Sequence, residues 1–181
     1  MGKIYYSFFN SSVLKKVFVA STKKGVCAVD FLTSEQSFLK NLRKQFPGDI
    51  ARDDRKNRKV LRQLKKYLKG ELKSFDCPLD MKGTSFEKKV WSALKRIPYG
   101  RTRSYKDVAK SIGHPKAFRA VGNANGSNSI PLIIPCHRVI ESNGGLGGFG
   151  HGLKVKAKLL NLEKVKLHAL KGGVSRQGGS L

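Results

Sequence analysis

Acidic residues are scarce in this chain. Only 12 Asp and Glu accompany 37 Lys and Arg, so the formal net charge is +25 over 181 residues. The excess is spread along the chain instead of being gathered in one tail, which favours a polyanionic partner. Nucleic acid is the simplest candidate and an anionic membrane surface the weaker one. A Lys-rich surface without any nucleic-acid function is the alternative.

Cysteine is also scarce. Cys27, Cys77 and Cys136 are an odd number, far apart and without a Cys-x-x-Cys pair, so they indicate neither a disulfide framework nor a clustered zinc site. At least one thiol should be free, and a buried position is the default for Cys27 and Cys77.

Long apolar runs are absent. No stretch approaches the roughly 20 apolar residues that cross a bilayer, and the N-terminus leads directly into a strand-like run. With 39% apolar and 27% charged residues, the chain can still bury a core. We expect a soluble, intracellular protein of the cytoplasm or nucleus.

The N-terminal half has the pattern of a small α/β unit. β-branched and aromatic residues dominate residues 4–9, 13–20 and 26–31, which predicts three strands in an antiparallel meander. Helical periodicity follows in residues 38–46 and 60–68. Residues 75–83 show no periodicity and predict a linker, so we place a scaffold domain at residues 1–79.

The C-terminal half is mostly helical, which makes the fold class α+β. Thr84 and Ser104 each begin a capping box, with Glu87 and Asp107 three residues later. Pro115 suits the first turn of a third helix, residues 116–123. The two short helices resemble a helix-turn-helix. A last helix covers residues 153–162; we place the second domain at 80–170 and a mobile, basic, Gly-rich tail at 171–181.

Six glycines gather in residues 144–152. Neither a Gly-Lys-Ser/Thr pattern nor a G-x-G-x-x-G register accompanies them, so a phosphate-binding loop is not indicated. A turn that lets a bulky group pass close to the backbone is the better interpretation.

Cys136 and His137 form the most informative dipeptide. An apolar run, residues 131–134, delivers the thiol between Pro135 and His137, and a neighbouring imidazole can help to generate the nucleophilic thiolate. Adjacent residues of a strand point to opposite faces, so the pair needs a turn or a bridging water. Glu163 is the best-placed carboxylate to orient the imidazole. The alternative is a buried structural Cys beside a surface His.

Residues 134–139, Ile-Pro-Cys-His-Arg-Val, resemble the active-site motif of the O6-alkylguanine-DNA alkyltransferases, also called methylated-DNA–protein-cysteine methyltransferases. The resemblance covers residues 84–165, in the order and near the spacing of the family. The N-terminal half matches in layout alone. The features that carry the match are Phe86, Tyr99-Gly100, Ser104-Tyr105, Arg119-Ala120-Val121-Gly122, Asn128, the motif, Gly148-Phe149, Leu153, Lys156, Leu159-Leu160 and Glu163.

The resemblance implies the chemistry of the site. Cys136 would accept the alkyl group from guanine O6, and His137 would be its base through a water, oriented by Glu163. Tyr105 would crowd the target phosphate and donate a proton to the leaving guanine. Asn128 would brace the active-site turn. Four further positions would belong to the substrate pocket: Pro131, Phe149, Gly150 and Lys156.

The resemblance also implies a DNA-binding mode without sequence readout. The second helix of the pair would enter the minor groove, where Ala117 and Ala120 allow close approach, and Arg119 would fill the gap left by the flipped nucleotide. Lys106, His114 and Ser142 occupy positions where the family contacts phosphates.

The sequence departs from the family around the substrate loop. Phe149 replaces a tyrosine of some members, and Gly150 stands where some have a serine that donates to guanine O6, which puts that stabilisation in doubt. His151 stands where glycine is common. The N-terminal half has two cysteines and no histidine, so we predict no zinc, and the resemblance implies no cofactor.

The sequence therefore predicts single-turnover DNA repair: transfer of the alkyl group from O6-alkylguanine, with O4-alkylthymine as a second possible substrate, in double-stranded DNA to Cys136. We expect a monomer without a membrane partner. A silent lesion-sensing relative is disfavoured because Cys136 is retained, and a cysteine hydrolase would need an oxyanion hole that the sequence does not reveal.

Overall fold

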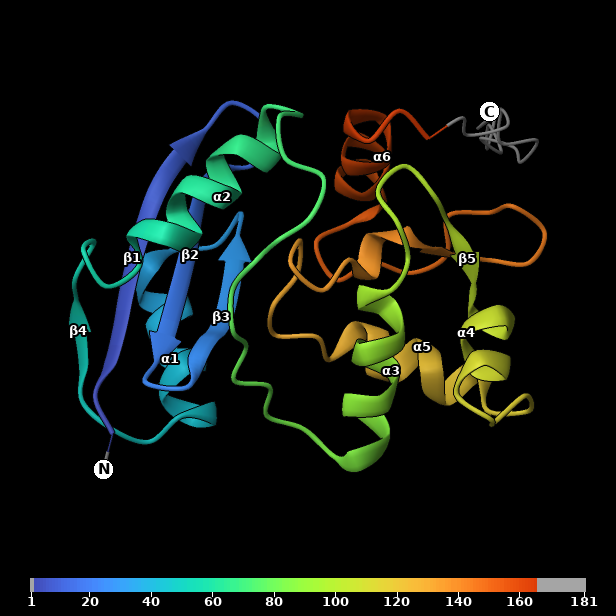
Figure 1. The fold of residues 1–181 in the computed structure, drawn as a ribbon, viewed down its shortest axis with the longest axis horizontal. Helices are drawn as coiled ribbons and strands as arrows, with labels where there is room; N and C mark the ends of the chain where they lie inside the picture. The colour runs from blue at the N-terminus through green and yellow to red at the C-terminus, as the bar shows by residue number, and fades with distance from the viewer. Residues whose placement is uncertain (1, 166–181) are drawn as a thin grey trace, which may run out of the picture.

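The computed structural model describes residues 2–165 (Figure 1). The predicted tail at 171–181 lies outside the described residues. Three apolar strands form the predicted antiparallel meander: β1 (Ile4–Ser11), β2 (Lys15–Thr22) and β3 (Gly25–Phe31). A short fourth strand, β4 (Ile50–Arg52), pairs parallel to β1, giving the order β3-β2-β1-β4. The sequence did not predict β4, because three residues are too few to show a period.

Helices cover both faces of this sheet. Alternate residues of β2 point to opposite sides, so Phe18 packs with α1 (Glu35–Gln45) on one face, while Val19 joins the larger core on the other. That larger core includes α2 (Arg58–Leu68), which buries Leu64 and Tyr67. Both helices were predicted.

The helical half begins with α3 (Ser85–Lys95) and continues with α4 (Tyr105–Ser111). Both predicted capping boxes are present: the side chains of Thr84 and Ser104 accept from the backbone three residues on, and Glu87 and Asp107 bond back. The remaining elements are β5 (Arg103–Ser104), α5 (Phe118–Gly126), the 3₁₀ turn η1 (Cys136–Arg138), β6 (Val139–Ile140) and α6 (Leu153–Leu162).

The predicted start of α5 is wrong. Pro115 does not occupy the first turn of the helix; it lies in a turn before it, and α5 begins at Phe118 and runs to Gly126 instead of covering 116–123. The backbone of Ala117 donates to the carbonyl of His114 at 2.9 Å, which closes that separate turn. A Pro at a turn and a Pro at a helix start look alike in sequence.

The two halves share one apolar core. A single buried cluster includes Val29 of β3 and Tyr67 of α2 together with Leu94 of α3, Val121 of α5 and Leu159 of α6. The segment between α2 and α3 runs between the sheet and the helices (Figure 1), and its Leu79 pairs with Val26 at the edge of β3. The boundary between residues 79 and 80 stays a prediction.

None of the helices within residues 2–165 combines the length and apolarity that a membrane span requires. Across the same residues, no three His, Cys, Asp or Glu side chains gather closely enough to hold a metal ion. Cys27, Cys77 and Cys136 are all free thiols. Cys27 is buried, as expected by default, but Cys77 is only half-buried, so the same expectation was wrong for Cys77.

Candidate active site

Cys136 follows a tight turn of the backbone. The amide of Ile134 donates to the carbonyl of Ile130 at 2.9 Å, and Leu132 between them has φ +73, a left-handed conformation that non-glycine residues rarely adopt. Cys136 and His137 then lie in the 3₁₀ turn η1 instead of on a strand. Because Cys136 and His137 lie in a 3₁₀ turn, their side chains are not forced to opposite faces as they would be on a strand.

Two asparagines hold the Cys136 turn in place. Asn128 donates to the carbonyl of Ile134 at 2.9 Å and accepts from the amide of Ile130 at 3.0 Å, so one side chain spans the turn. Asn125 of α5 is buried and donates to the carbonyl of Cys136 at 3.3 Å. Asn128 was predicted from the sequence, whereas Asn125 was not, because an amide side chain in a helix looks like a solvent-exposed residue.

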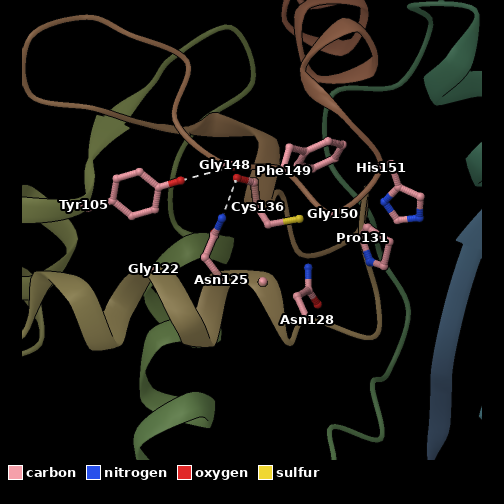
Figure 2. A pocket seen from close by; sticks show the side chains of 11 residues that line it. Tyr105, Gly122, Asn125, Asn128, Pro131, Cys136, Gly148, Phe149, Gly150 and His151 are labelled. Atoms are coloured by element: carbon pink, nitrogen blue, oxygen red, sulfur yellow. Dashed lines mark hydrogen bonds between the residues drawn. The ribbon is translucent and has the colours of Figure 1, made fainter.

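The thiol lies at a cavity of about 330 Å³. This volume is within the range of small-molecule sites. In Figure 2 the sulfur of Cys136 points into the cavity, with the side-chain nitrogen of Asn128 turned toward it and Tyr105 on the far side. The lining residues are Tyr105, Gly122, Asn125, Gly126, Asn128, Pro131, Cys136, Gly148, Phe149, Gly150 and His151.

The thiol is protonated in the resting protein. Cys136 is only 4% exposed, and burial raises its pKa above the ordinary value, although a hydrogen bond from Asn128 and the charge of Lys156 act in the opposite direction. The site therefore needs a base before the sulfur becomes a nucleophile.

The imidazole of His137 follows Cys136 in the same 3₁₀ turn. His137 is fully buried, and its Nε2 lies 2.9 Å from Oε1 of Glu163, the first residue after α6. Burial raises the pKa of Glu163, but hydrogen bonds from His137 and Arg138 outweigh it and hold that pKa at about 2. An ionised carboxylate only accepts, so Nε2 carries the proton and Nδ1 is the free lone pair. Nδ1 is buried without a hydrogen-bond partner among the described residues.

Two residues around Glu163, Arg138 and Tyr67, had no role predicted from the sequence. Arg138 donates through Nε to Oε2 at 2.9 Å and through Nη2 to Oε1 at 2.9 Å, which is a bidentate ion pair. Tyr67 of α2 donates to Oε1 at 2.6 Å. Arg138 follows the Cys-His dipeptide directly, so its position in the motif is a signal that could have drawn attention to it, whereas a tyrosine in the other half of the chain gives no such signal.

Lys156 does not line the cavity, contrary to its predicted place in the substrate pocket. Its fully buried ammonium lies beneath the Gly-rich loop and donates to the carbonyls of Val139 at 2.5 Å, Leu146, and Gly148 at 3.3 Å. Burial lowers its pKa to about 8. At neutral pH the three ammonium protons therefore match three carbonyls, and Lys156 holds the loop that carries Phe149.

Tyr105 closes the side of the cavity opposite Asn128 (Figure 2). Its hydroxyl donates to the carbonyl of Gly148 at 3.3 Å, and burial raises its pKa. A Cβ on Gly147 would lie 2.9 Å from the Tyr105 ring, and Gly147 has φ +66. Glycine there allows the bulky ring to approach the backbone, as the sequence predicted for this loop.

His151 connects the loop to the sheet half. Its Nε2 lies 2.8 Å from Oδ1 of Asp30, and its ring stacks on Phe31 with centroids 3.9 Å apart. Because His151 also lines the cavity, β3 supports one wall of the pocket from outside.

The predicted DNA-contacting residues lie at the surface. Lys106, His114, Arg119, Ala120 and Ser142 are exposed and Ala117 is half-buried. Lys106 and Arg119 both approach the ring of Phe118, at 5.8 and 6.0 Å from its centroid. Phe118 is itself 36% exposed at the start of α5 and was missed in the sequence. His114 packs instead against Phe86, and no described contact joins Ser142 to the others.

The fold and the site together define a class: a cysteine-dependent transfer protein whose buried thiol, beside a His-Glu pair, faces a cavity next to a helix-turn-helix. Comparison with known families gives the particular one. Residues 4–81 match the family model "6-O-methylguanine DNA methyltransferase, ribonuclease-like domain", and residues 85–165 match its "DNA binding domain". The chain belongs to the 6-O-methylguanine DNA methyltransferase family.

Individual relatives agree with this assignment. A methylated-DNA–protein-cysteine methyltransferase of Methanosarcina acetivorans is 44% identical over 160 residues, which covers 88% of this chain and 98% of that relative. A crystal structure of Mycobacterium tuberculosis OGT in complex with DNA has a TM-score of 0.77 at 39% identity and covers 88% of this chain and 92% of that one. The O6-methylguanine-DNA methyltransferase of Pyrococcus kodakaraensis reaches a TM-score of 0.61 at 26% identity, over 90% and 99% of the two chains.

Proposed function

We propose that this chain repairs double-stranded DNA by moving the alkyl group of O6-alkylguanine irreversibly to Cys136. The observation that carries the proposal is the buried Cys136 thiol at the cavity, in a 3₁₀ turn beside a His137 whose free Nδ1 faces no other partner among the described residues. O4-alkylthymine is a second candidate substrate of the same pocket.

The reaction needs one proton to leave the thiol. His137 takes it at Nδ1 through a bridging water and becomes an imidazolium that Glu163 stabilises across the 2.9 Å contact. The Cys136 thiolate attacks the alkyl carbon in line with the C–O6 bond. The S–C bond forms as the C–O6 bond breaks, and the electron pair leaves on guanine.

The leaving guanine is neutralised by a proton from the Tyr105 hydroxyl, which burial keeps protonated in the resting site. The proton that His137 took from the thiol returns through water to the Tyr105 oxygen, so both side chains end neutral. Gly150 offers no hydroxyl to O6, so the backbone N–H groups of the loop that Lys156 holds are the remaining donors. A thioether is not hydrolysed back, so each molecule reacts once.

DNA approaches through α5. Its exposed start presents Arg119, Phe118 and the small Ala120 to the minor groove, and Lys106 lies beside them for the phosphates. Arg119 fills the space of the flipped nucleotide, since a planar guanidinium can stack between bases. Asn125 at the other end of α5 contacts the Cys136 carbonyl, so the helix that meets DNA also holds the reacting turn.

The test is transfer of radiolabel from duplex DNA carrying O6-methylguanine to the protein. We expect one label per molecule, and no label on a Cys136→Ala variant, because its side chain has no nucleophile. Cys77→Ala is the matched control: it removes a half-buried thiol of the interdomain segment and should retain transfer.

Two outcomes contradict the proposal. DNA binding without any transfer identifies a silent lesion sensor, and release of label with repeated turnover identifies a hydrolase. A duplex with O4-methylthymine, run in parallel, measures the breadth of the pocket.

A further inference from the structure

Tyr67 lies in the sheet half yet reaches the centre of the active site. It is fully buried on α2, and its hydroxyl lies 2.6 Å from Oε1 of Glu163 and 3.1 Å from Nε2 of His137. These are residues 96 and 70 positions away in the chain. The ring of Tyr67 packs against Phe75 and Tyr99, as expected for a tyrosine that fills the core. Core packing alone does not require the hydroxyl to bond with Glu163.

The directions of the hydrogen bonds follow from the charge of Glu163. Because the carboxylate is ionised, every neighbour within reach must donate to it, and the Tyr67 hydroxyl points its proton at Oε1. The single Nε2–H of His137 is then shared between Oε1 of Glu163 at 2.9 Å and the oxygen of Tyr67 at 3.1 Å. Burial beside Glu163 raises the pKa of Tyr67 well above its ordinary value, so the hydroxyl remains a donor.

The ion pair between Arg138 and Glu163 makes the Tyr67 hydrogen bond important for the position of Oε1. The Arg138 guanidinium binds both oxygens of Glu163 and donates through Nη1 to the carbonyl of Ile97 at 2.6 Å, so the position of this fork does not depend on where His137 points. The Tyr67 hydroxyl adds a donor to Oε1 at 2.6 Å, the same oxygen that lies 2.9 Å from Nε2 of His137, and so helps to hold Oε1 beside the imidazole. The carboxylate is thereby shared between the cation and the imidazole instead of being drawn to the cation.

We propose that Tyr67 is a positioning residue for alkyl transfer: it holds Oε1 of Glu163 so that His137 keeps its proton on Nε2 and presents Nδ1 to Cys136. This inference rests on the proposed function. It also assigns the sheet half a part in the chemistry, because α2 supplies a group that the helical half lacks.

The test compares four proteins in single-turnover label transfer: wild type, Tyr67→Phe, Glu163→Gln and the double variant. Tyr67→Phe keeps the buried ring and removes the hydroxyl. We expect about 10-fold slower transfer at neutral pH with unchanged DNA affinity, by analogy with the loss of a hydrogen-bond partner behind a metal-ligating histidine. Since Tyr67 acts through Glu163, the double variant should be no slower than Glu163→Gln alone.

Tyr99→Phe is the matched control. Its hydroxyl lies beside the same cluster but donates to the backbone carbonyl of Leu162 at 3.0 Å. This variant loses a partly buried hydrogen bond without touching the imidazole, so it should transfer at the wild-type rate. Equal slowing by Tyr67→Phe and Tyr99→Phe would assign both to general loosening of the core and overturn the inference.

A second readout does not depend on transfer. Nitrogen-15 NMR of the His137 ring should show Nε2 protonated and Nδ1 bare in wild type and a mixture of tautomers in Tyr67→Phe. An unchanged tautomer with an unchanged rate overturns the role of Tyr67. If the wild-type protein transfers no label, the proposed function fails, and the NMR comparison still decides what Tyr67 does to His137.

Discussion

A carboxylate without access to water has to be matched by donors on each oxygen, and Glu163 is. It accepts from the side chains of Tyr67, His137 and Arg138 and from the backbone of Gly100 at 3.0 Å. These contacts come from three separate segments of the chain. Removing one partner of such a buried pair leaves an uncompensated charge. The resulting loss of folding stability is larger than the net stabilisation that the intact pair provides.

The free energy of unfolding should therefore decrease at acid pH, as Glu163 becomes protonated. The pKa of Glu163 is about 2 in the folded state against 4.5 for a free side chain, so its contribution, about 3 kcal/mol, is complete above pH 4.5 and disappears as the pH falls toward 2. Burial lowers the pKa of His137 below 6.5, so the unfolded state binds a proton first and stability begins to fall below that pH. Thermal melts followed by circular dichroism from pH 7 to 2 measure the loss.

Glu163→Gln separates these two contributions. The variant should be less stable at neutral pH and should lose much less stability than wild type between pH 4.5 and 2. Equal slopes for the two proteins in that interval would show that Glu163 is not the carboxylate responsible.

Some residues of the site can be predicted from the sequence and others cannot. Cys136 and His137 are predictable because thiol and imidazole are adjacent, and Glu163 because the family pattern extends to it. Tyr67 occupies an apolar position of a helical pattern, which predicts that its ring is buried. Periodicity carries no information on which atom, 96 residues later, its hydroxyl meets.

At the scale of elements, local signals and the antiparallel pairing of the three long consecutive strands were predictable, whereas the pairings of the short strands were not. Capping boxes located α3 and α4 because both bonds of a box lie within four residues. β4, β5 and β6 have only two or three residues each, and their existence depends on distant partners. The conformation at Cys136 could not be predicted for the same reason, because Asn128 and Asn125, which lie outside the motif, hold its backbone.

The Gly-rich loop depends on α6 for its shape. Lys156→Met should leave the carbonyls of Val139, Leu146 and Gly148 without their donor, at a cost of about 1–3 kcal/mol in unfolding free energy. Transfer should slow because Phe149 and Gly148 line the cavity. Chemical denaturation and single-turnover transfer measure the two effects.

Lys154→Met is the control for that substitution. It makes the same change on the same helix at an exposed position and should leave both quantities near wild type. Identical behaviour of the two variants would mean that the buried ammonium does not hold the loop.

At the scale of the molecule, the charge of +25 exceeds what one groove contact requires. If about five phosphates are neutralised, the logarithm of DNA affinity should fall with the logarithm of salt concentration at a slope of roughly −4 to −5. Lys106→Ala should reduce the steepness by about 1, and Lys23→Ala, in the exposed turn between β2 and β3, should leave it unchanged. Fluorescence anisotropy over a salt series measures the slopes; equal effects of both lysines would refute a localised DNA surface.

The apolar core that runs from Val29 through Tyr67 to Leu94 and Leu159 has a consequence for modularity. A scaffold and a catalytic part joined by a linker are usually free to be exchanged or lost independently. Here each part covers apolar surface of the other, and β3 supports the pocket through Asp30 and His151. The smallest unit of this chain that can be inherited, transplanted or redesigned intact therefore includes both halves.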